Sequence, residues 1–209
     1  MHKLIFIITF LFFGNHYCWA QKVIQKEFSS EELHALSIID DGIYKIKIQS
    51  SEEPTIKLEL HISGEYSESV IIEEKIIKGI LSLKTGFAPF FKLKNDKLAA
   101  HKVMALEIKL IIPETISVEI KSKLASAKTI GKIKNLAVVL ENGNCDSSNF
   151  QGNAHIKTEG GNIIVHAQNN VSGSAISKFG IIENTLPKHR KYSIEAESNN
   201  GNISLLQTE

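Results

Sequence analysis

Apolar and polar residues alternate in short stretches through residues 114–209, and this pattern recurs every 18 to 21 residues. The recurrence is seen when the chain is aligned on positions 125, 143, 161, 180 and 201. The column five residues before these positions is aliphatic or small: Ile120, Val138, Ile156, Ala175 and Ala196. The column two residues after them holds Ala127, Cys145, Ile163, Ile182 and Ile203. The column six before is mostly polar, namely Glu119, Ala137, His155, Ser174 and Glu195.

A period of two indicates strands, and columns that recur from unit to unit indicate strands stacked in register. We therefore predict an all-β protein in which residues 114–209 form a right-handed parallel β-solenoid (β-helix), with one coil per unit and aliphatic side chains inside. The test of this prediction is whether Val138, Ile156 and Ile194 lie on stacked strands and face the interior.

Glycine and asparagine mark the corners between the predicted strands. Asn142-Gly143, Gly160-Gly161 and Asn200-Gly201 offer backbones that tolerate a positive φ, which a sharp corner can require. A second corner is expected near Gly131, Gly152, Asn169–Asn170 and Pro187. Three asparagines align at the first corner, Asn144, Asn162 and Asn202, and we interpret them as a hydrogen-bonded structural stack rather than a ligand site.

Residues 21–113 are also rich in alternating stretches but show no clear repeat. Strands are expected at 43–48, 55–62, 80–83 and 106–112. These strands form either the first face of the solenoid or an antiparallel cap on it, since an open coil end leaves backbone groups unpaired. Ser29–Leu33 could form a short capped helix. We expect one continuous domain over 21–209, composed of an N-terminal β region at 21–113 and coils at 114–209.

The stretch Phe87–Phe91 places three phenylalanines beside a proline and a glycine. One interpretation is a loop folded back onto the core. The other is an exposed patch that contacts a partner or a lipid headgroup.

The first twenty residues have the pattern of a signal peptide. Lys3 precedes an apolar run from Leu4 to Phe13, and small residues stand at the positions that determine cleavage after Ala20. The run is shorter than the ~20 residues that a permanent span needs. Bulky polar residues before Cys18 disfavour a lipoprotein. We therefore expect an exported chain, periplasmic, on the outer surface or secreted, with no integral membrane span after cleavage.

Charge and cysteine content bear on the kind of partner and on the presence of disulfides. The chain has 24 basic and 23 acidic residues, and Lys3 is the only charged residue in the first twenty, so the mature chain is formally neutral. Such a balance disfavours a nucleic-acid partner. Cys145 is then the only thiol, so no internal disulfide is possible. Its place in an inward column indicates a buried thiol rather than a reactive one.

Several segments together resemble a known family. They are Asn95–Val103, Ile112-Pro113, Gly143–Asp146, Asn149–Gly152, Thr158–Ile163 and Asn200–Ile203. They resemble the adhesin-type β-solenoid proteins of bacterial envelopes, a family of unknown function of the head-domain-like auto-transporter adhesin type. The resemblance covers nearly the whole mature chain and implies a solenoid fold. It brings no catalytic residues. At Phe179-Gly180-Ile181 the corner asparagine is replaced, which implies a reshaped corner.

No catalytic, cofactor-binding or metal-binding residue is predicted, and no cofactor. The six mature histidines show no metal-ligand spacing, and a surface pair is the expectation for His155 and His166. Three hypotheses remain: a non-enzymatic surface module that binds a protein or glycan partner at the envelope, a carbohydrate-active solenoid enzyme, and an accessory protein of envelope signalling. The enzyme hypothesis requires carboxylates converging in a cleft, with Glu119, Glu195 and Glu197 as the candidates.

Overall fold

The structure is a computed structural model that describes residues 21–91 and 104–208. Within them every regular element is a strand, apart from the single 3-10 turn η1 (Ser67–Ser69). The predicted signal peptide and the whole of Asn95–Val103 lie outside the described residues. The strands of the first half are β1 (Lys22–Ser29), β2 (Ala35–Ile39), β3 (Lys45–Ser51), β4 (Thr55–Ser63), β5 (Val70–Ile77), β6 (Ile80–Phe87) and β7 (Ala105–Pro113). Those of the second half are β8 (Ser117–Ser122), β9 (Ser126–Leu140), β10 (Cys145–Thr158), β11 (Ile163–Ala167), β12 (Val171–Ser177), β13 (Ile182–Asn184), β14 (Tyr192–Ser198) and β15 (Ile203–Gln207).

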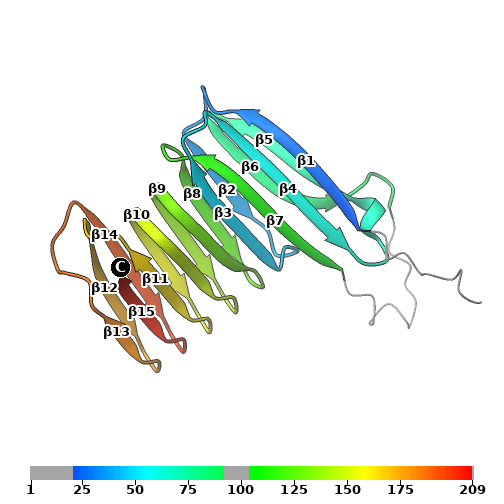
Figure 1. The fold of residues 1–209 in the computed structure, drawn as a ribbon. Coiled ribbons are helices and arrows are strands. Elements are labelled where there is room, and N and C mark those ends of the chain that lie inside the picture. Colours follow the sequence, from blue (N-terminus) through cyan, green and yellow to red (C-terminus); the bar gives the residue numbers. More distant parts are fainter. Residues whose placement is uncertain (1–20, 92–103, 209) are drawn as a thin grey trace, which may run out of the picture.

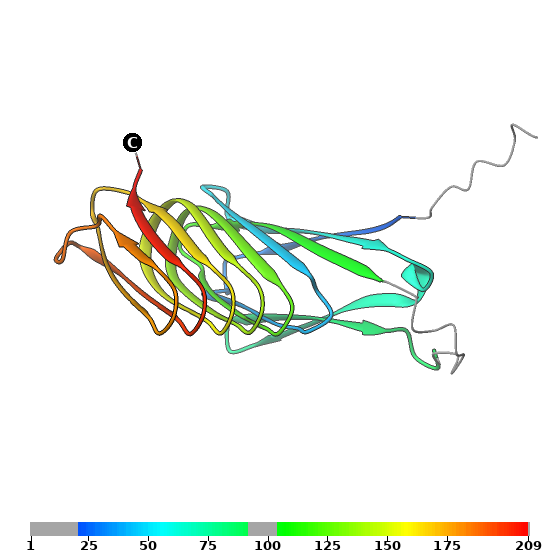
Figure 2. The same cartoon turned by 90° about the horizontal axis from the view of Figure 1, so that it is seen from below.

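The strands pair into one mixed sheet that curls into two facing layers (Figures 1 and 2). One layer has the order β1-β4-β7-β3-β9-β10-β11-β15-β13. The other follows β5-β6-β2-β8-β9-β10-β14-β12. Strands β9 and β10 are long enough to belong to both layers. The aliphatic side chains between the layers form a single core.

The second half pairs only in parallel, whereas the first half also contains antiparallel pairs. Strands β1, β4 and β7 are antiparallel neighbours, and so are β5 and β6. The last pair is a two-residue hairpin whose turn residues, Lys78 and Gly79, both have positive φ (48° and 75°), as a type I′ turn requires. The all-β prediction is confirmed, and the sheet is mixed, as the antiparallel alternative for residues 21–113 allowed.

The predicted columns occupy equivalent positions on neighbouring strands. Ile120 pairs with Val138, Val138 with Ile156, and Ile156 with Ala196. In the other layer Ala127 pairs with Cys145, Cys145 with Ile163, and Ile163 with Ile203. All of these residues are buried. Ile194 pairs with Ala154 and is buried too, so the in-register stacking of the aliphatic columns is confirmed.

The order of the last two units differs from the order in the sequence. Strands β14 and β15 pair with β10 and β11, whereas β12 and β13 pair with β14 and β15. The final stretch of chain is therefore inserted between its two predecessors. The last two units have equivalent residues in each column, so the aliphatic columns stay aligned despite the exchanged order.

The corner glycines are needed for space rather than for a positive φ. A Cβ on Gly143 would lie 1.6 Å from the carbonyl oxygen of Ala125, and one on Gly161 would lie 1.8 Å from that of Gly143. The same holds for Gly201 against Gly161, at 1.9 Å. None of these glycines has a positive φ. The expectation that glycine is needed here for a positive φ is therefore wrong. Glycine is needed because successive turns stack too closely to leave room for a Cβ. At the other corner Gly131 and Gly152 do have positive φ (95° and 147°), and β9 and β10 bend there without interruption.

The corner asparagines link successive turns. The backbone N–H of Asn162 donates to Oδ1 of Asn144 at 2.8 Å, and that of Asn202 donates to Oδ1 of Asn162 at 2.8 Å. The N–H of Ile181 donates to Oδ1 of Asn202 at 2.8 Å. This ladder follows the exchanged order of the turns, and it satisfies backbone donors that the corners would otherwise leave unpaired.

Strands β3, β4, β6 and β7 match the expected stretches, whereas β1, β2 and β5 were not expected, and the two alternatives for this half are combined. Strands β2 and β3 run parallel to β8 and β9 and extend the stack, whereas β1, β4 and β5 add antiparallel pairs beyond it. The helix expected at Ser29–Leu33 is wrong. Ser29 ends β1, and the N–H of Leu33 donates to Ser30 O at 3.0 Å, which closes a turn instead.

Candidate binding groove

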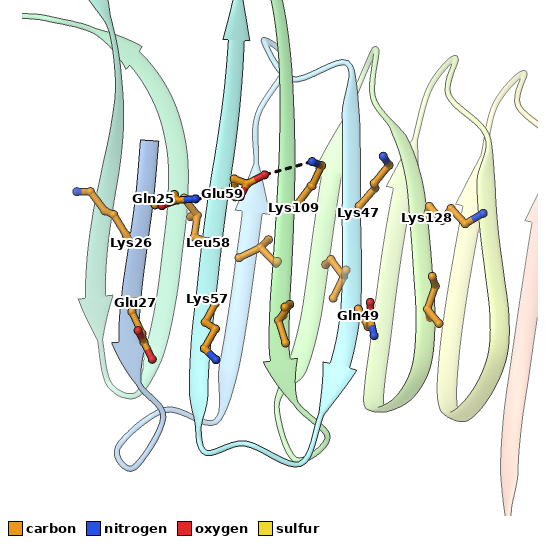
Figure 3. A pocket seen from close by; sticks show the side chains of 14 residues that line it. Gln25, Lys26, Glu27, Lys47, Gln49, Lys57, Leu58, Glu59, Lys109 and Lys128 are labelled. Carbon is orange, nitrogen blue, oxygen red and sulfur yellow. Dashed lines mark hydrogen bonds and ion pairs between the residues drawn. The ribbon is translucent and has the colours of Figure 1, made fainter. Parts of the chain in front are cut away.

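The outer face of β1, β4, β7, β3 and β9 carries a groove of ≈ 890 Å³ (Figure 3). Strand alternation points every second side chain of these strands into it, opposite to the core. Two rows of side chains cross the strands here. One row is mainly basic and the other is partly apolar.

The basic row contains three lysines on adjacent strands. Lys47 on β3 lies directly opposite Lys109 on β7 and directly opposite Lys128 on β9. Neighbouring strands are ~4.8 Å apart, so the three stems leave the sheet at that interval. Like charges at directly opposite positions destabilise a sheet. A chain that keeps three of them in a row therefore needs compensating carboxylates or an anionic ligand.

Each lysine of the basic row has a carboxylate beside it. The pairs are Lys109 with Glu59 (3.2 Å), Lys47 with Glu107 (2.6 Å) and Lys128 with Asp146 (3.8 Å). The lysine side chains remain well exposed, and exposed pairs of this kind contribute only ~0–1 kcal/mol each. The ammonium groups can consequently exchange these partners for a bound anion at little cost.

Glu59 marks the acidic end of the row. Its carboxylate hydrogen-bonds His61, accepts from Nε2 of Gln25 at 3.1 Å and accepts from Nζ of Lys109 at 3.2 Å. These bonds, with that of His61 the largest, lower the pKa of Glu59 to about 2. Hydrogen bonds to the ionised form stabilise it. Glu59 therefore stays charged at every physiological pH and orients Lys109.

The second row adds apolar surface next to the lysines. Ile111 on β7 and Ile130 on β9 both lie opposite Gln49 on β3, and both isoleucines are exposed. Lys57 and Glu27 continue this row onto β4 and β1. The groove thus offers cations along one side and an aliphatic strip along the other, an arrangement suited to an extended ligand that is anionic and partly apolar.

Two of the carboxylates named for the enzyme hypothesis, Glu119 and Glu195, lie on the opposite outer face and line a smaller hollow of ≈ 450 Å³. Glu119 pairs with Ala137, which pairs with His155, which pairs with Glu195. Three strand steps of ~4.8 Å separate the two glutamates by ~14 Å. Glu119 contacts Lys121 at 2.6 Å, and Glu195 lies 3.6 Å from His155. Glu119 and Glu195 are therefore too far apart to act together.

Glu197 shares the outer face of β14 with Glu195, two residues away, and its carboxylate lies 3.7 Å from Nζ of Lys157. Its side chain is therefore held in a surface ion pair across two strands. No cleft-lining role is apparent for it, because Glu197 is absent from the hollow that Glu119 and Glu195 border.

Cys145 is fully enclosed, as its column predicts. It is 1 % exposed, and burial raises the pKa of its thiol to about 12. A thiol that stays protonated is a poor nucleophile and a poor metal ligand. His155 and His166 lie on strands of different layers, since His155 pairs with Glu195 of β14 and His166 with Leu206 of β15. The expected surface pair is therefore wrong.

The aromatic stretch divides between both interpretations. Phe91 stacks on Phe87 with ring centroids 4.9 Å apart and meets Tyr66 edge-on at 5.3 Å, which holds this loop against η1. Phe90 is 99 % exposed. The loop is thus folded back around two of its phenylalanines and presents the third to solvent.

Two further observations concern metals and membranes. Among residues 21–91 and 104–208, no three His, Cys, Asp or Glu side chains are grouped so that they could hold a metal ion. In the same part of the chain, no helix has the length and apolar character needed to cross a membrane.

The groove was not found from the sequence. Its lysines come from β1, β3, β4, β7 and β9, which are far apart in the chain. A local signal did exist, since Lys45-Ile46-Lys47 and Glu107-Ile108-Lys109 show outward charges in alternation. The register that aligns Lys47 with Lys109 and Lys128 could not be derived from those segments.

Comparison with known proteins gives a likeness of fold. A putative cell adhesion protein from Clostridium sporogenes aligns over 90% of this chain and 100% of its own, with a TM-score of 0.65 and 21% identity. Putative adhesins from Bacteroides fragilis (12% identity, TM-score 0.36, 90% and 99% covered) and Parabacteroides distasonis (12%, 0.32, 88% and 97%) are more distant. No family model and no curated protein matches the sequence. At 21% identity the first likeness shows the fold alone, and the other two carry no argument.

Proposed function

We propose that this chain is an exported, non-enzymatic binding module of the adhesin type, which holds an acidic glycan of the cell envelope in the groove over β1, β4, β7, β3 and β9. The observation that carries the proposal is the row of Lys109, Lys47 and Lys128 on adjacent strands of that groove. The module is one continuous domain over 21–209, and its stacked half is a right-handed parallel β-solenoid.

The solenoid interpretation is supported by the parallel pairing of every strand from β8 to β15 and by the aligned columns. A stack of this kind gives a rigid surface on which side chains repeat at the strand spacing. Export is supported by the signal-peptide pattern of residues 1–20. The location is then periplasmic, on the outer surface or secreted.

An acidic glycan fits the groove better than other anionic polymers do. Its carboxylate or sulfate groups recur along the chain and can meet successive lysines, while the C–H faces of its rings can contact Ile111 and Ile130. Nucleic acid is a weaker match because the mature chain is formally neutral, whereas nucleic-acid binding depends on a concentration of positive charge. Binding of this type weakens as salt screens the charges.

The test replaces the three lysines of the row together. The chain 21–209 is titrated with alginate, polygalacturonate and a neutral glucan, and binding is followed by calorimetry at two salt concentrations. With each ion pair contributing up to ~1 kcal/mol, the variant Lys47→Gln/Lys109→Gln/Lys128→Gln should bind the acidic glycans about tenfold or more weakly.

A matched control removes the same charge away from the groove, from the other outer face (Lys121 and Lys157) and from the corner after β8 (Lys123). Lys121→Gln/Lys123→Gln/Lys157→Gln changes three lysines that also pair with carboxylates and are about equally exposed. This control should bind like the unmodified chain. Equal losses in both triple variants, or absence of binding to either acidic glycan, would refute the groove as the site. Tighter binding of single-stranded DNA would point to a nucleic acid instead, and turnover of either glycan would overturn the non-enzymatic assignment.

A further inference from the structure

The stack of strands ends at β12 and β13, which have neighbours on one side only. Strand β12 pairs with β14 and β13 pairs with β15, and no strand of the described residues covers their other edges (Figure 1). An edge of this kind presents unpaired N–H and C=O groups to solvent.

The core is open at this end. Ile182 occupies the same column as Ile163 and Ile203, which are fully buried, yet it is 42 % exposed because no further turn lies over it. The adjoining corner exposes Phe179 (73 %) and Ile181 (75 %), and Ile176 of β12 is exposed as well. Four large apolar side chains are therefore exposed within residues 175–183, and one of them, Ile176, lies on the outer face of β12 opposite Glu197.

A loop of the chain closes part of this end. Leu186 is buried and fills the space next to Gly173, where a Cβ would lie 2.9 Å from its side chain. The N–H of Gly173 donates to Pro187 O at 3.2 Å, and Nδ2 of Asn184 donates to Gly173 O at 2.9 Å. The first half of β12 is thus covered, whereas residues 175–183 are left open.

The opposite end of the molecule is bridged by its own side chains. The ammonium group of Lys22 on β1 donates to the carbonyl oxygens of Glu68 (2.8 Å) and Val70 (3.0 Å), and Lys26 pairs with Glu74 of β5 at 2.8 Å. These contacts join the edge strands of the two layers across their gap. Charged side chains on an edge strand oppose the addition of a further strand. That end is therefore unsuited to receive the open end of another copy.

We propose that two copies of this chain associate end to end through residues 175–183 around a two-fold axis, with the open edge of β12 in each copy pairing antiparallel with the open edge of β13 in the other. A partner must offer two edges separated by the thickness of one turn, and an identical turn supplies that spacing. The stretch carries one cation and one anion, Lys178 and Glu183, so a second copy is not repelled. Self-complementary two-fold contacts are the commonest form of homo-oligomer.

This contact buries Phe179, Ile181 and Ile182 and covers the exposed end of the core. It lies on the face of the stack farthest from the groove, on strands that do not line it, so it is independent of the proposed function. The two grooves of such a pair remain open, one toward each end of an elongated particle.

The test measures the mass of the chain 21–209 in solution. Analytical ultracentrifugation up to about 100 µM detects a dimer whose Kd is ~10 µM or tighter. We expect twice the chain mass for the unmodified protein and the single-chain mass for Phe179→Lys/Ile181→Lys. Both side chains are exposed, so the variant should fold, and an unchanged far-UV circular dichroism spectrum and Tm verify this.

The matched control is Phe90→Lys/Ile76→Lys, which also replaces one exposed phenylalanine and one exposed isoleucine but at the opposite end. It should remain dimeric. A single-chain mass for the unmodified protein, a dimer that survives the first variant, or loss of the dimer in the control alone would each overturn the proposal. Species that grow beyond two chains with concentration would also overturn it, because they indicate a contact that does not close.

Discussion

The close approach of stacked turns makes Gly161 the sharpest test of the fold. In Gly161→Ala the new Cβ would lie 1.8 Å from the carbonyl oxygen of Gly143, whereas ordinary contact begins at ~3.4 Å. The neighbouring atom belongs to the backbone and cannot rotate away. The two turns must therefore separate by more than an ångström.

That separation stretches the hydrogen bonds that join the turns. The N–H of Asn162 donates to Oδ1 of Asn144 at 2.8 Å, and the N–H of Cys145 donates to Asn162 O at 2.9 Å. Overpacking of a well-packed interior costs ~1–3 kcal/mol, and backbone strain of this kind places the change at the upper end. We expect Gly161→Ala to lower the free energy of unfolding by about 3 kcal/mol, equivalent to a fall in Tm of about 6–12 °C.

Gly160 provides the control because it is adjacent in the chain and has room for a side chain. Its Cβ would come no closer than 3.8 Å to any neighbour, and its φ is not in the left-handed region. Gly160→Ala should be neutral or stabilising by up to ~1 kcal/mol, since it reduces the entropy of the unfolded chain. Urea titrations followed by far-UV circular dichroism measure both variants. A difference below about 0.5 kcal/mol between them would refute the stacking argument.

Two more outcomes test the interior of the structure. Asp40→Ala should lower the free energy of unfolding by about 3 kcal/mol in urea titrations, because the buried carboxylate accepts hydrogen bonds from the N–H groups of Gly42 and Ile43 and from the N–H and hydroxyl of Thr85. The control is Asp41→Ala. The Asp41 side chain is exposed and accepts one backbone hydrogen bond, from Lys123, so its loss should cost under ~1 kcal/mol. Equal losses of stability in the two variants would show that the hydrogen bonds of Asp40 stabilise the fold no more than the single bond of Asp41 does. The thiol of Cys145 should resist a thiol reagent at pH 8 in the native chain and react at once in denaturant, and rapid native labelling would contradict its burial. Because its pKa is raised from 9.0 to about 12, its contribution to stability is complete below pH 9 and should be lost progressively as the pH rises toward 12.

The stacking register was predictable because burial constrains it strongly. A shift of one residue would turn Val138 and Ile156 outward, so only one alignment places the aliphatic columns inside. The order of the turns was not predictable in the same way. Ala175 and Ala196 are equivalent in one column, as Ile182 and Ile203 are in the other, so the columns are satisfied by either order.

The groove could not be derived from the sequence because it depends on which strands are neighbours. Lys47, Lys109 and Lys128 each occupy an outward position of an alternating strand, as Lys121 and Lys157 do, so the local sequence shows that they face outward but not that they lie side by side. Their proximity arises only when β3 is placed between β7 and β9. An antiparallel cap was one of the two alternatives for the first half, but the pairing of β1 with β4, β4 with β7 and β5 with β6 could not be assigned for the same reason.

The exchanged position of the last turn bears on how the chain can be completed. Residues 171–184 have no strand to pair with when they leave the ribosome, because the strands that they pair with, β14 and β15, are synthesised later. These residues therefore remain unpaired until residues 192–207 have been synthesised and have paired with β10 and β11. Folding of residues 171–184 thus depends on residues 192–207, and a chain truncated before residue 192 would lose two turns rather than one.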